Sequence, residues 1–87
     1  MKLVFSERAW AHYVEWQGDD QRTLAKLNAL IRECKRDPFR GLGKPEPLEG
    51  NLKGWWSRRI TPEHRLVYRG TGKGEAQTLE VAQCRFC

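Results

Sequence analysis

The chain has 87 residues, of which 39% are apolar and 31% charged, and its net charge is +5. This length allows one domain, near the lower limit at which a single hydrophobic core supports folding without disulfides or metals. The composition excludes a disordered or collagen-like chain, and no apolar run suits a membrane span or a secretory signal peptide. The positive charge favours a polyanionic partner, such as RNA, DNA, an anionic membrane or an acidic protein. The length and the lack of a signal peptide predict a single cytoplasmic domain, residues 1–87. The three cysteines are an odd number and do not form a disulfide framework, so we expect reduced thiols.

The N-terminal part is predicted to be a strand followed by two helices. An apolar run over 2–5 ends at Ser6, a favourable N-cap residue, and so predicts a strand that leads directly into a helix over 7–17. An aromatic stripe along this helix is predicted from the helical spacing of Trp10, Tyr13, Val14 and Gln17, of which the last is polar. Gly18 is expected to end it, and Asp19 or Asp20 to cap a second helix that runs to Pro38. The apolar face of the second helix is formed by Leu24, Leu27, Leu30, Ile31 and Cys34.

The C-terminal half is predicted to be a long loop followed by three strands. Residues 38–53 contain three prolines and three glycines without periodicity, which indicates an ordered loop of the kind that is often functional. Strand-like runs over 55–60 and 65–69 predict a hairpin, and alternation over 78–86 predicts a last strand. The order βααβββ predicts an α+β fold in which the helices cover one face of an antiparallel sheet.

Arginines are concentrated in the strand block, where one face of the sheet must be solvated. They are Arg58, Arg59, Arg65, Arg69 and Arg85. Guanidinium groups bind phosphate oxygens in a bidentate manner, so this face is either an RNA platform or an ordinary solvated basic face. The hairpin register distinguishes these interpretations. A three-residue loop over 61–63 pairs Arg59 with Arg65 on one face, whereas a two- or four-residue loop separates them.

Glu46 lies between Pro45 and Pro47 in the long loop. Proline fixes its own φ and restrains the residue before it, so Glu46 is either a carboxylate on a stiffened loop or part of a rigid surface turn. As a general base it would take the proton from a ribose 2′-OH, while cations stabilise the phosphorane and an acid protonates the 5′-oxygen. This chemistry requires no metal.

The remaining candidate groups are interpreted as structural. Tryptophans can stack on bases, but in a core this small they usually pack, and of Trp55 and Trp56 one is expected to point inward. Cys84 and Cys87 form a C-x-x-C, yet residues three apart on a strand face opposite sides and no second zinc-ligand pair exists. His12 is likewise interpreted as structural.

Several short motifs together identify a family resemblance. They are Gly43-Lys-Pro-Glu-Pro-Leu48, Asn51-Leu52, Trp56-Ser-Arg-Arg-Ile60, Glu63-His-Arg-Leu-Val-Tyr68 and Cys84-Arg85. In these motifs the chain resembles the YoeB (Txe) toxins of the RelE superfamily. The resemblance implies a ribosome-dependent mRNA endoribonuclease without a cofactor or metal, neutralised by a YefM-like antitoxin and often homodimeric. Operator DNA would be bound only through the antitoxin. The fold implied is RelE-like, with two N-terminal helices on a four-stranded antiparallel sheet.

The resemblance also implies roles for individual residues. Glu46 is similar to the general base and Arg65 to the transition-state clamp. Cys87 stands at the position of the general acid. We predict that four further residues contact the substrate, namely Arg59, Lys44, Arg85 and His64.

Two positions depart from the family pattern. Position 49 is usually Lys in these toxins and is Glu49 here, while the usual C-terminal Cys-Arg-Tyr-His-Tyr is replaced by a sequence that ends at Cys87. A positioned acid contributes about 10² to 10⁴ in rate, so its replacement predicts weakened cleavage with fold and antitoxin binding retained. A thiol is mostly protonated at neutral pH and can donate a proton, although the terminal carboxylate is on the same residue.

Three interpretations of the missing histidine remain open. They are an attenuated toxin, a toxin whose acid is His64 or a ribosomal group, and a truncated or altered form of an active parent. The alternative function is a catalytically weak module that binds the antitoxin and acts as co-repressor.

Overall fold

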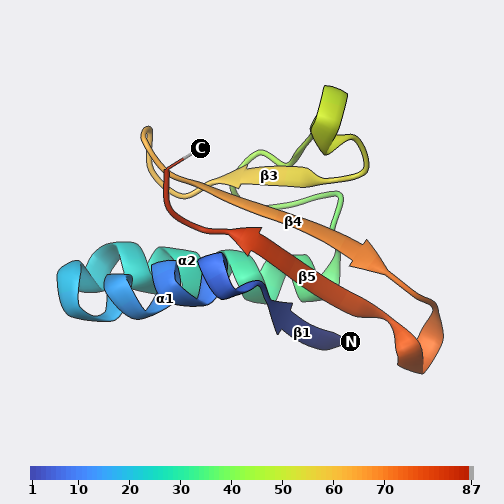
Figure 1. Cartoon of the computed structure of the whole chain (residues 1–87), viewed down its shortest axis with the longest axis horizontal. Coiled ribbons are helices and arrows are strands. Elements are labelled where there is room, and N and C mark those ends of the chain that lie inside the picture. The colour runs from blue at the N-terminus through green and yellow to red at the C-terminus, as the bar shows by residue number, and fades with distance from the viewer. Residues whose placement is uncertain (87) are drawn as a thin grey trace.

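The computed structural model describes residues 1–86, in which two helices pack against one face of a five-stranded sheet (Figure 1). The elements in chain order are β1 (Lys2–Phe5), α1 (Glu7–Asp19), α2 (Gln21–Arg36), β2 (Glu46–Pro47), β3 (Trp56–Arg59), β4 (Arg65–Thr71) and β5 (Thr78–Gln83). Short 3₁₀ turns lie at Gly50–Leu52 and Gly74–Ala76. Neither helix in this part of the chain is both long and apolar enough to cross a membrane.

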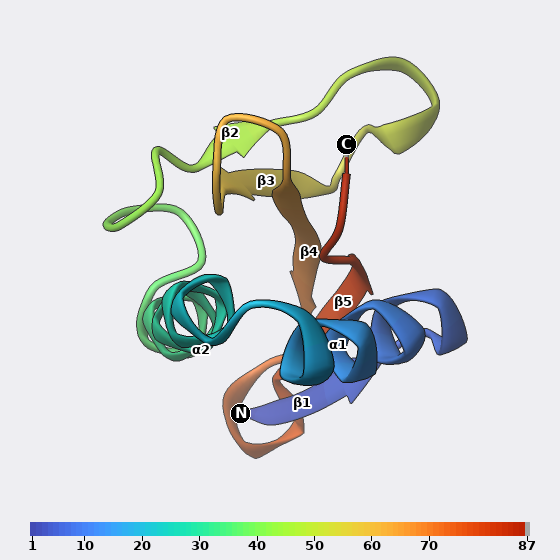
Figure 2. The same ribbon diagram turned by 90° about the vertical axis from the view of Figure 1, so that its left-hand side faces the viewer.

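The sheet has the strand order β1-β5-β4-β3-β2, and Figure 2 shows both helices on the same side of it. The α+β class and the helix-covered sheet are confirmed, but the predicted strand count of four is wrong. The loop contributes β2, a two-residue edge strand whose Pro47 is tolerated because edge strands need no donor on their outer side. The sheet is mostly antiparallel, as predicted, and the exception is β1, which lies parallel to β5.

Both helices begin at side-chain caps. The Ser6 hydroxyl accepts the N–H of Ala9 at 3.0 Å, and the Asp20 carboxylate accepts the N–H groups of Arg22 and Thr23. Hydrogen bonds from Thr23 hold the pKa of Asp20 below its usual value. The first helix passes Gly18 and ends at Asp19, so the predicted stop at Gly18 is wrong by one residue.

The core lies between the helices and the inner sheet face. The α2 face was predicted correctly, with Leu27, Leu30 and Cys34 completely buried. On α1 the buried residues are Ala9 and Trp16, whereas Trp10 is 54% exposed. The expected stripe of α1 is therefore partly a surface feature, in which Trp10 contacts the rings of Phe5 and Tyr13.

Arg58 is completely buried, and its hydrogen bonds hold the loop that follows α2 against the sheet. Its guanidinium donates to the carbonyl oxygens of Asp37, Arg40 and Leu42, and its Nε donates to the Tyr68 hydroxyl at 3.0 Å. The Tyr68 hydroxyl in turn donates to the Pro38 carbonyl at 2.6 Å, and burial raises the pKa of Tyr68 to about 12. The carbonyl of Asp37, the C-cap of α2, carries partial negative charge, so a cation is favourable there.

The C-terminal segment 84–86 leaves the sheet and packs against α1 and the hairpin turn. The predicted strand to 86 is therefore too long, because β5 ends at Gln83. The N–H of Cys84 donates to His12 Nδ1 at 3.2 Å, and Trp16 Nε1 donates to the Cys84 carbonyl at 2.8 Å. Two α1 side chains thus hold this segment.

Replacement of Arg58 should destabilise the protein strongly. We expect Arg58→Met to lower the free energy of unfolding by about 2 to 4 kcal/mol, because several buried polar groups lose their partner together. Arg59→Met, its exposed neighbour, is the matched control and should change the free energy by less than about 0.5 kcal/mol. Urea unfolding measures both, and equal effects would contradict the role of Arg58.

Stability should also depend on the protonation of His12. Burial lowers the pKa of His12 below 6.5, so as the pH falls the unfolded chain takes up this proton before the folded one. The contribution of His12 is therefore fully present above pH 6.5 and decreases as the pH falls toward the folded-state pKa. We expect His12→Asn, which keeps an acceptor for Cys84, to unfold with a flatter pH dependence between about pH 7 and 5. The free energy of unfolding is measured by urea titration at several pH values in that range. An equal change with pH in the original protein and in His12→Asn would refute the prediction.

Candidate functional site

The hairpin register places Arg59 and Arg65 on one face of the sheet. Arg59 pairs directly with Arg65 across β3 and β4, and the N–H of Ile60 donates to the His64 carbonyl at 2.9 Å. Three residues, 61–63, therefore form the loop, and the Thr61 hydroxyl accepts the N–H groups of Glu63 and His64. The three-residue loop is the register that the shared-face interpretation required, and it is confirmed.

Glu46 projects from the same face. It pairs with Ser57 across β2 and β3, and Ser57 stands two residues before Arg59 on β3. Directly paired residues share a face, as do alternate residues of one strand. The intervening residues Leu66 and Tyr68 belong to the core, so this face points away from the helices.

The face carries positive charge around one carboxylate. Glu46 and Arg59 are exposed and Arg65 is half-buried. Arg65 Nη1 donates to the Ser57 hydroxyl at 3.4 Å, which directs the guanidinium toward the middle of the site. Within residues 1–86, no ion pair within 4 Å involves Glu46, Arg59 or Arg65. Both charge types therefore remain available to a ligand.

Lys44 lies at the border of this face. The loop reaches this face through Gly43, whose carbonyl accepts the N–H of Arg59 at 2.7 Å. Gly43 has a φ of +86°, and a Cβ there would lie 2.7 Å from a methyl of Leu30, so only glycine fits. Lys44 itself has a φ of +52°, an uncommon conformation for a residue with a side chain. Lys44 and Arg59 border a common pocket of about 270 Å³.

His64 has structural contacts with the C-terminal segment. Its Nδ1 accepts the N–H of Phe86 at 2.8 Å, and its ring contacts Trp16 edge-on with centroids 4.8 Å apart. The N–H of Arg65 donates to the Phe86 carbonyl at 3.0 Å. The segment therefore reaches the site next to Arg65, although a substrate contact by His64 stays a prediction.

Arg85 is directed toward α1. It lies over the ring of Trp16 at 4.3 Å, donates to Asp19 at 2.8 Å and has Glu15 within 3.9 Å. The guanidinium of Arg85 is therefore paired with carboxylates of α1. Its role in substrate binding stays a prediction.

The first cysteine of the C-x-x-C, Cys84, lies in the core. The Cys84 thiol is buried, and burial raises its pKa to about 12, so it stays protonated at neutral pH. Its sulfur lies 3.5 Å from the Ala9 carbonyl oxygen, to which it donates. Cys87, the predicted acid, lies outside the described residues. Among residues 1–86, no cluster of three or more His, Cys, Asp or Glu side chains is arranged to hold a metal ion.

Ser57 was not recognised as part of the site from the sequence. The expectation that Arg58 belongs to the basic sheet face is wrong, because Arg58 is completely buried on the side of the core, where it pairs with Leu66. Ser57 is 1% exposed and lies between Glu46 and Arg65, and Arg58 holds the loop that leads to Glu46. Alternation from Arg59 could have placed Ser57 on the same face. Nothing in the sequence distinguished Arg58 from its neighbour. Together, a loop carboxylate and two guanidinium groups without a carboxylate partner in residues 1–86 form a site suited to proton transfer beside an anion.

Comparison with known proteins matches the chain to one family. Residues 5–87 match the model of the YoeB-like toxin of bacterial type II toxin–antitoxin systems. The chain is 52% identical over 86 residues to toxin YoeB of Escherichia coli K12, which covers 99% of this chain and 98% of that protein.

Solved structures agree. A YoeB/ParE toxin from Agrobacterium tumefaciens is 59% identical, with a TM-score of 0.97 and coverage of 100% and 99%. The Staphylococcus aureus YoeB dimer and YoeB–YefM heterotetramer are both 35% identical, with TM-scores of 0.86 and 0.88 and coverage of 100% and 97%. The matched family model and the near-complete coverage of these relatives show that the chain belongs to the YoeB-like toxins of bacterial type II toxin–antitoxin systems.

Proposed function

We propose that this toxin is a ribosome-dependent endoribonuclease that cuts mRNA. The observation that supports it is the shared face of Glu46, Arg59 and Arg65, fixed by the registers of two strand pairs. A carboxylate alone or cations alone would suit many ligands. A base next to two guanidinium groups suits a reaction in which a hydroxyl loses a proton while a phosphate gains charge.

The reaction uses the ribose as its own nucleophile. Glu46 takes the proton of the 2′-OH, and the 2′-oxygen attacks the adjacent phosphorus. Arg65, with Arg59 beside it, stabilises the phosphorane oxygens, where charge develops. The bond from phosphorus to the 5′-oxygen then breaks, and an acid protonates that oxygen, leaving a 2′,3′-cyclic phosphate and a 5′-hydroxyl. We assign the acid to Cys87, which follows a residue bonded to Arg65.

The partners follow from the relatives. We propose a YefM-like antitoxin as the neutralising partner, a homodimer of the free toxin, and contact with operator DNA only through the antitoxin. The S. aureus relatives are described as a YoeB dimer and a YoeB–YefM complex, which supports the first two of these. The net charge of +5 favours both an acidic antitoxin and RNA. A cytoplasmic location follows from action on the ribosome.

Removal of the base should abolish cleavage without unfolding the protein. We expect Glu46→Gln to lower mRNA cleavage on translating ribosomes by about 10² to 10⁴, measured by primer extension. Because Glu46 is exposed, its free energy of unfolding should change by less than about 0.5 kcal/mol. Glu49→Gln in the same loop is the matched control and should keep cleavage at or above the original level. Undiminished cleavage by Glu46→Gln would overturn the assignment.

The identity of residue 87 should set the rate. We expect Cys87→His to raise cleavage by about 10-fold or more, because an imidazole is a better proton donor near neutral pH than a thiol. Cys87→Ser controls for loss of the thiol and should cleave no faster than the original protein. If neither the original protein nor Cys87→His cuts mRNA, the chain acts instead as an antitoxin-binding and co-repressor module.

A further inference from the structure

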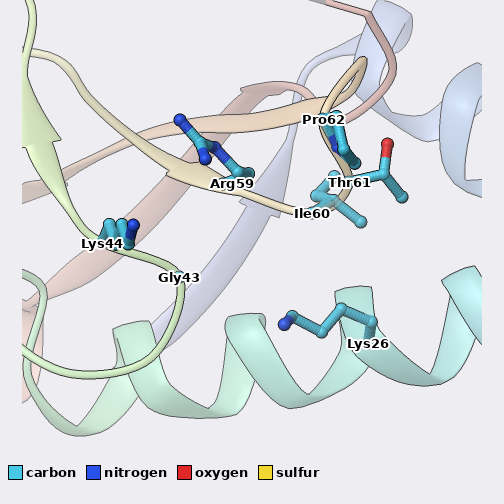
Figure 3. Close-up of a pocket in the computed structure, with 7 residues that line it drawn as sticks. All are labelled: Lys26, Gly43, Lys44, Arg59, Ile60, Thr61 and Pro62. Carbon is cyan, nitrogen blue, oxygen red and sulfur yellow. The ribbon is translucent and has the colours of Figure 1, made fainter.

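A second cationic site lies beside the proposed catalytic face, in the pocket between α2, the Gly43–Lys44 loop and the hairpin turn. The pocket is lined by Lys26, Gly43, Lys44, Arg59, Ile60, Thr61 and Pro62. Three of these residues are basic and none is acidic. Figure 3 shows the Lys26 side chain extending from α2 toward the loop at Gly43.

Lys26 has no partner of its own in this part of the molecule. It is half-buried, although lysine is usually exposed, and Ile60 next to it is buried. No hydrogen bond or ion pair within residues 1–86 involves its ammonium group, whereas Arg36, Arg69 and Arg85 each have a carboxylate. A partly desolvated cation without a counter-charge attracts an anionic group.

The pocket continues from the catalytic face through Arg59. This residue lines the pocket and also stands opposite Arg65, and in Figure 3 its side chain leaves β3 on the side away from α2. At Arg59 the β3 edge is occupied by the loop that precedes β2, since the Gly43 carbonyl accepts the N–H of Arg59 at 2.7 Å. A chain of phosphates that passes Arg65 and Arg59 would therefore continue past Lys44 to reach Lys26 on α2.

We propose that Lys26, together with Lys44 at the rim of this pocket, binds a second phosphate of the RNA strand, next to the one that is cut. The pocket volume of about 270 Å³ leaves room for a phosphate group. Because a phosphate carries no base identity, the pocket would position the strand without reading its sequence. The proposal rests on the proposed function, and it adds Lys26 as a substrate-positioning residue.

Direct binding to an RNA that cannot be cut tests the pocket separately from catalysis. We expect Lys26→Gln to weaken binding of a short 2′-O-methyl RNA by about three- to tenfold. It should also lower the slope of log affinity against log salt by about 0.7, the value for one contact with a single strand. Lys35→Gln is the matched control, because Lys35 is exposed on the same helix roughly two and a half turns away, on the opposite side.

Equal binding by the Lys26 and Lys35 variants would overturn the proposal. So would a Lys26→Gln variant that binds RNA normally but loses affinity for a YefM-like antitoxin, since the pocket would then accept a carboxylate of the protein partner. On ribosomes, Lys26→Gln should raise KM with kcat retained. Failure of the original protein to cut mRNA would refute the proposed function alone, because binding of the 2′-O-methyl RNA decides the pocket independently.

Discussion

The buried guanidinium of Arg58 connects the parts of this small protein that no regular element joins. It contacts the carbonyls of the loop after α2 and the Tyr68 hydroxyl on the next strand, without a carboxylate partner within 4 Å in residues 1–86. A charge in such a place is tolerated only when its donors are satisfied. Because the partners are backbone carbonyls, Arg58 fixes the path of the chain as well as its own side chain. That path leads to Gly43, Lys44 and Glu46.

The proposed catalytic face depends on this path and on a second anchor near the C-terminus. The loop after α2 enters the sheet as β2, where pairing with Ser57 places Glu46 beside the hairpin arginines. From the other side, Trp16, His12 and His64 hold the segment 84–86 and bring Phe86 against Arg65. The site is thus assembled from a loop, a hairpin and a C-terminal segment. Helix α1 contributes only supporting contacts.

Charge is distributed unevenly between these supports and the site. Arg69 and Arg85 have carboxylate partners and lie over aromatic rings, so the interactions of their guanidinium groups are made within the protein itself. Arg59, Arg65, Lys44 and Lys26 have no such partners in the described part of the chain. Exposed ion pairs contribute little stability, so the lack of a partner at the exposed Lys44 and Arg59 costs the fold little.

The sequence by itself determined the two helices, the α2 face and the hairpin, because periodicity, caps and turn residues act over a few neighbouring positions. The family followed from the resemblance of its sequence motifs. The sequence also defined which hairpin register would bring Arg59 and Arg65 together, although not that this register forms. Only the tertiary structure decided that Arg58 is buried while Arg59 is exposed, that β1 joins β5 in parallel and that Glu46 enters the sheet as an edge strand. These features depend on contacts between residues far apart in the chain. Local pattern therefore cannot specify them, and adjacent arginines with the same intrinsic preferences acquire opposite roles from the elements that pack around them.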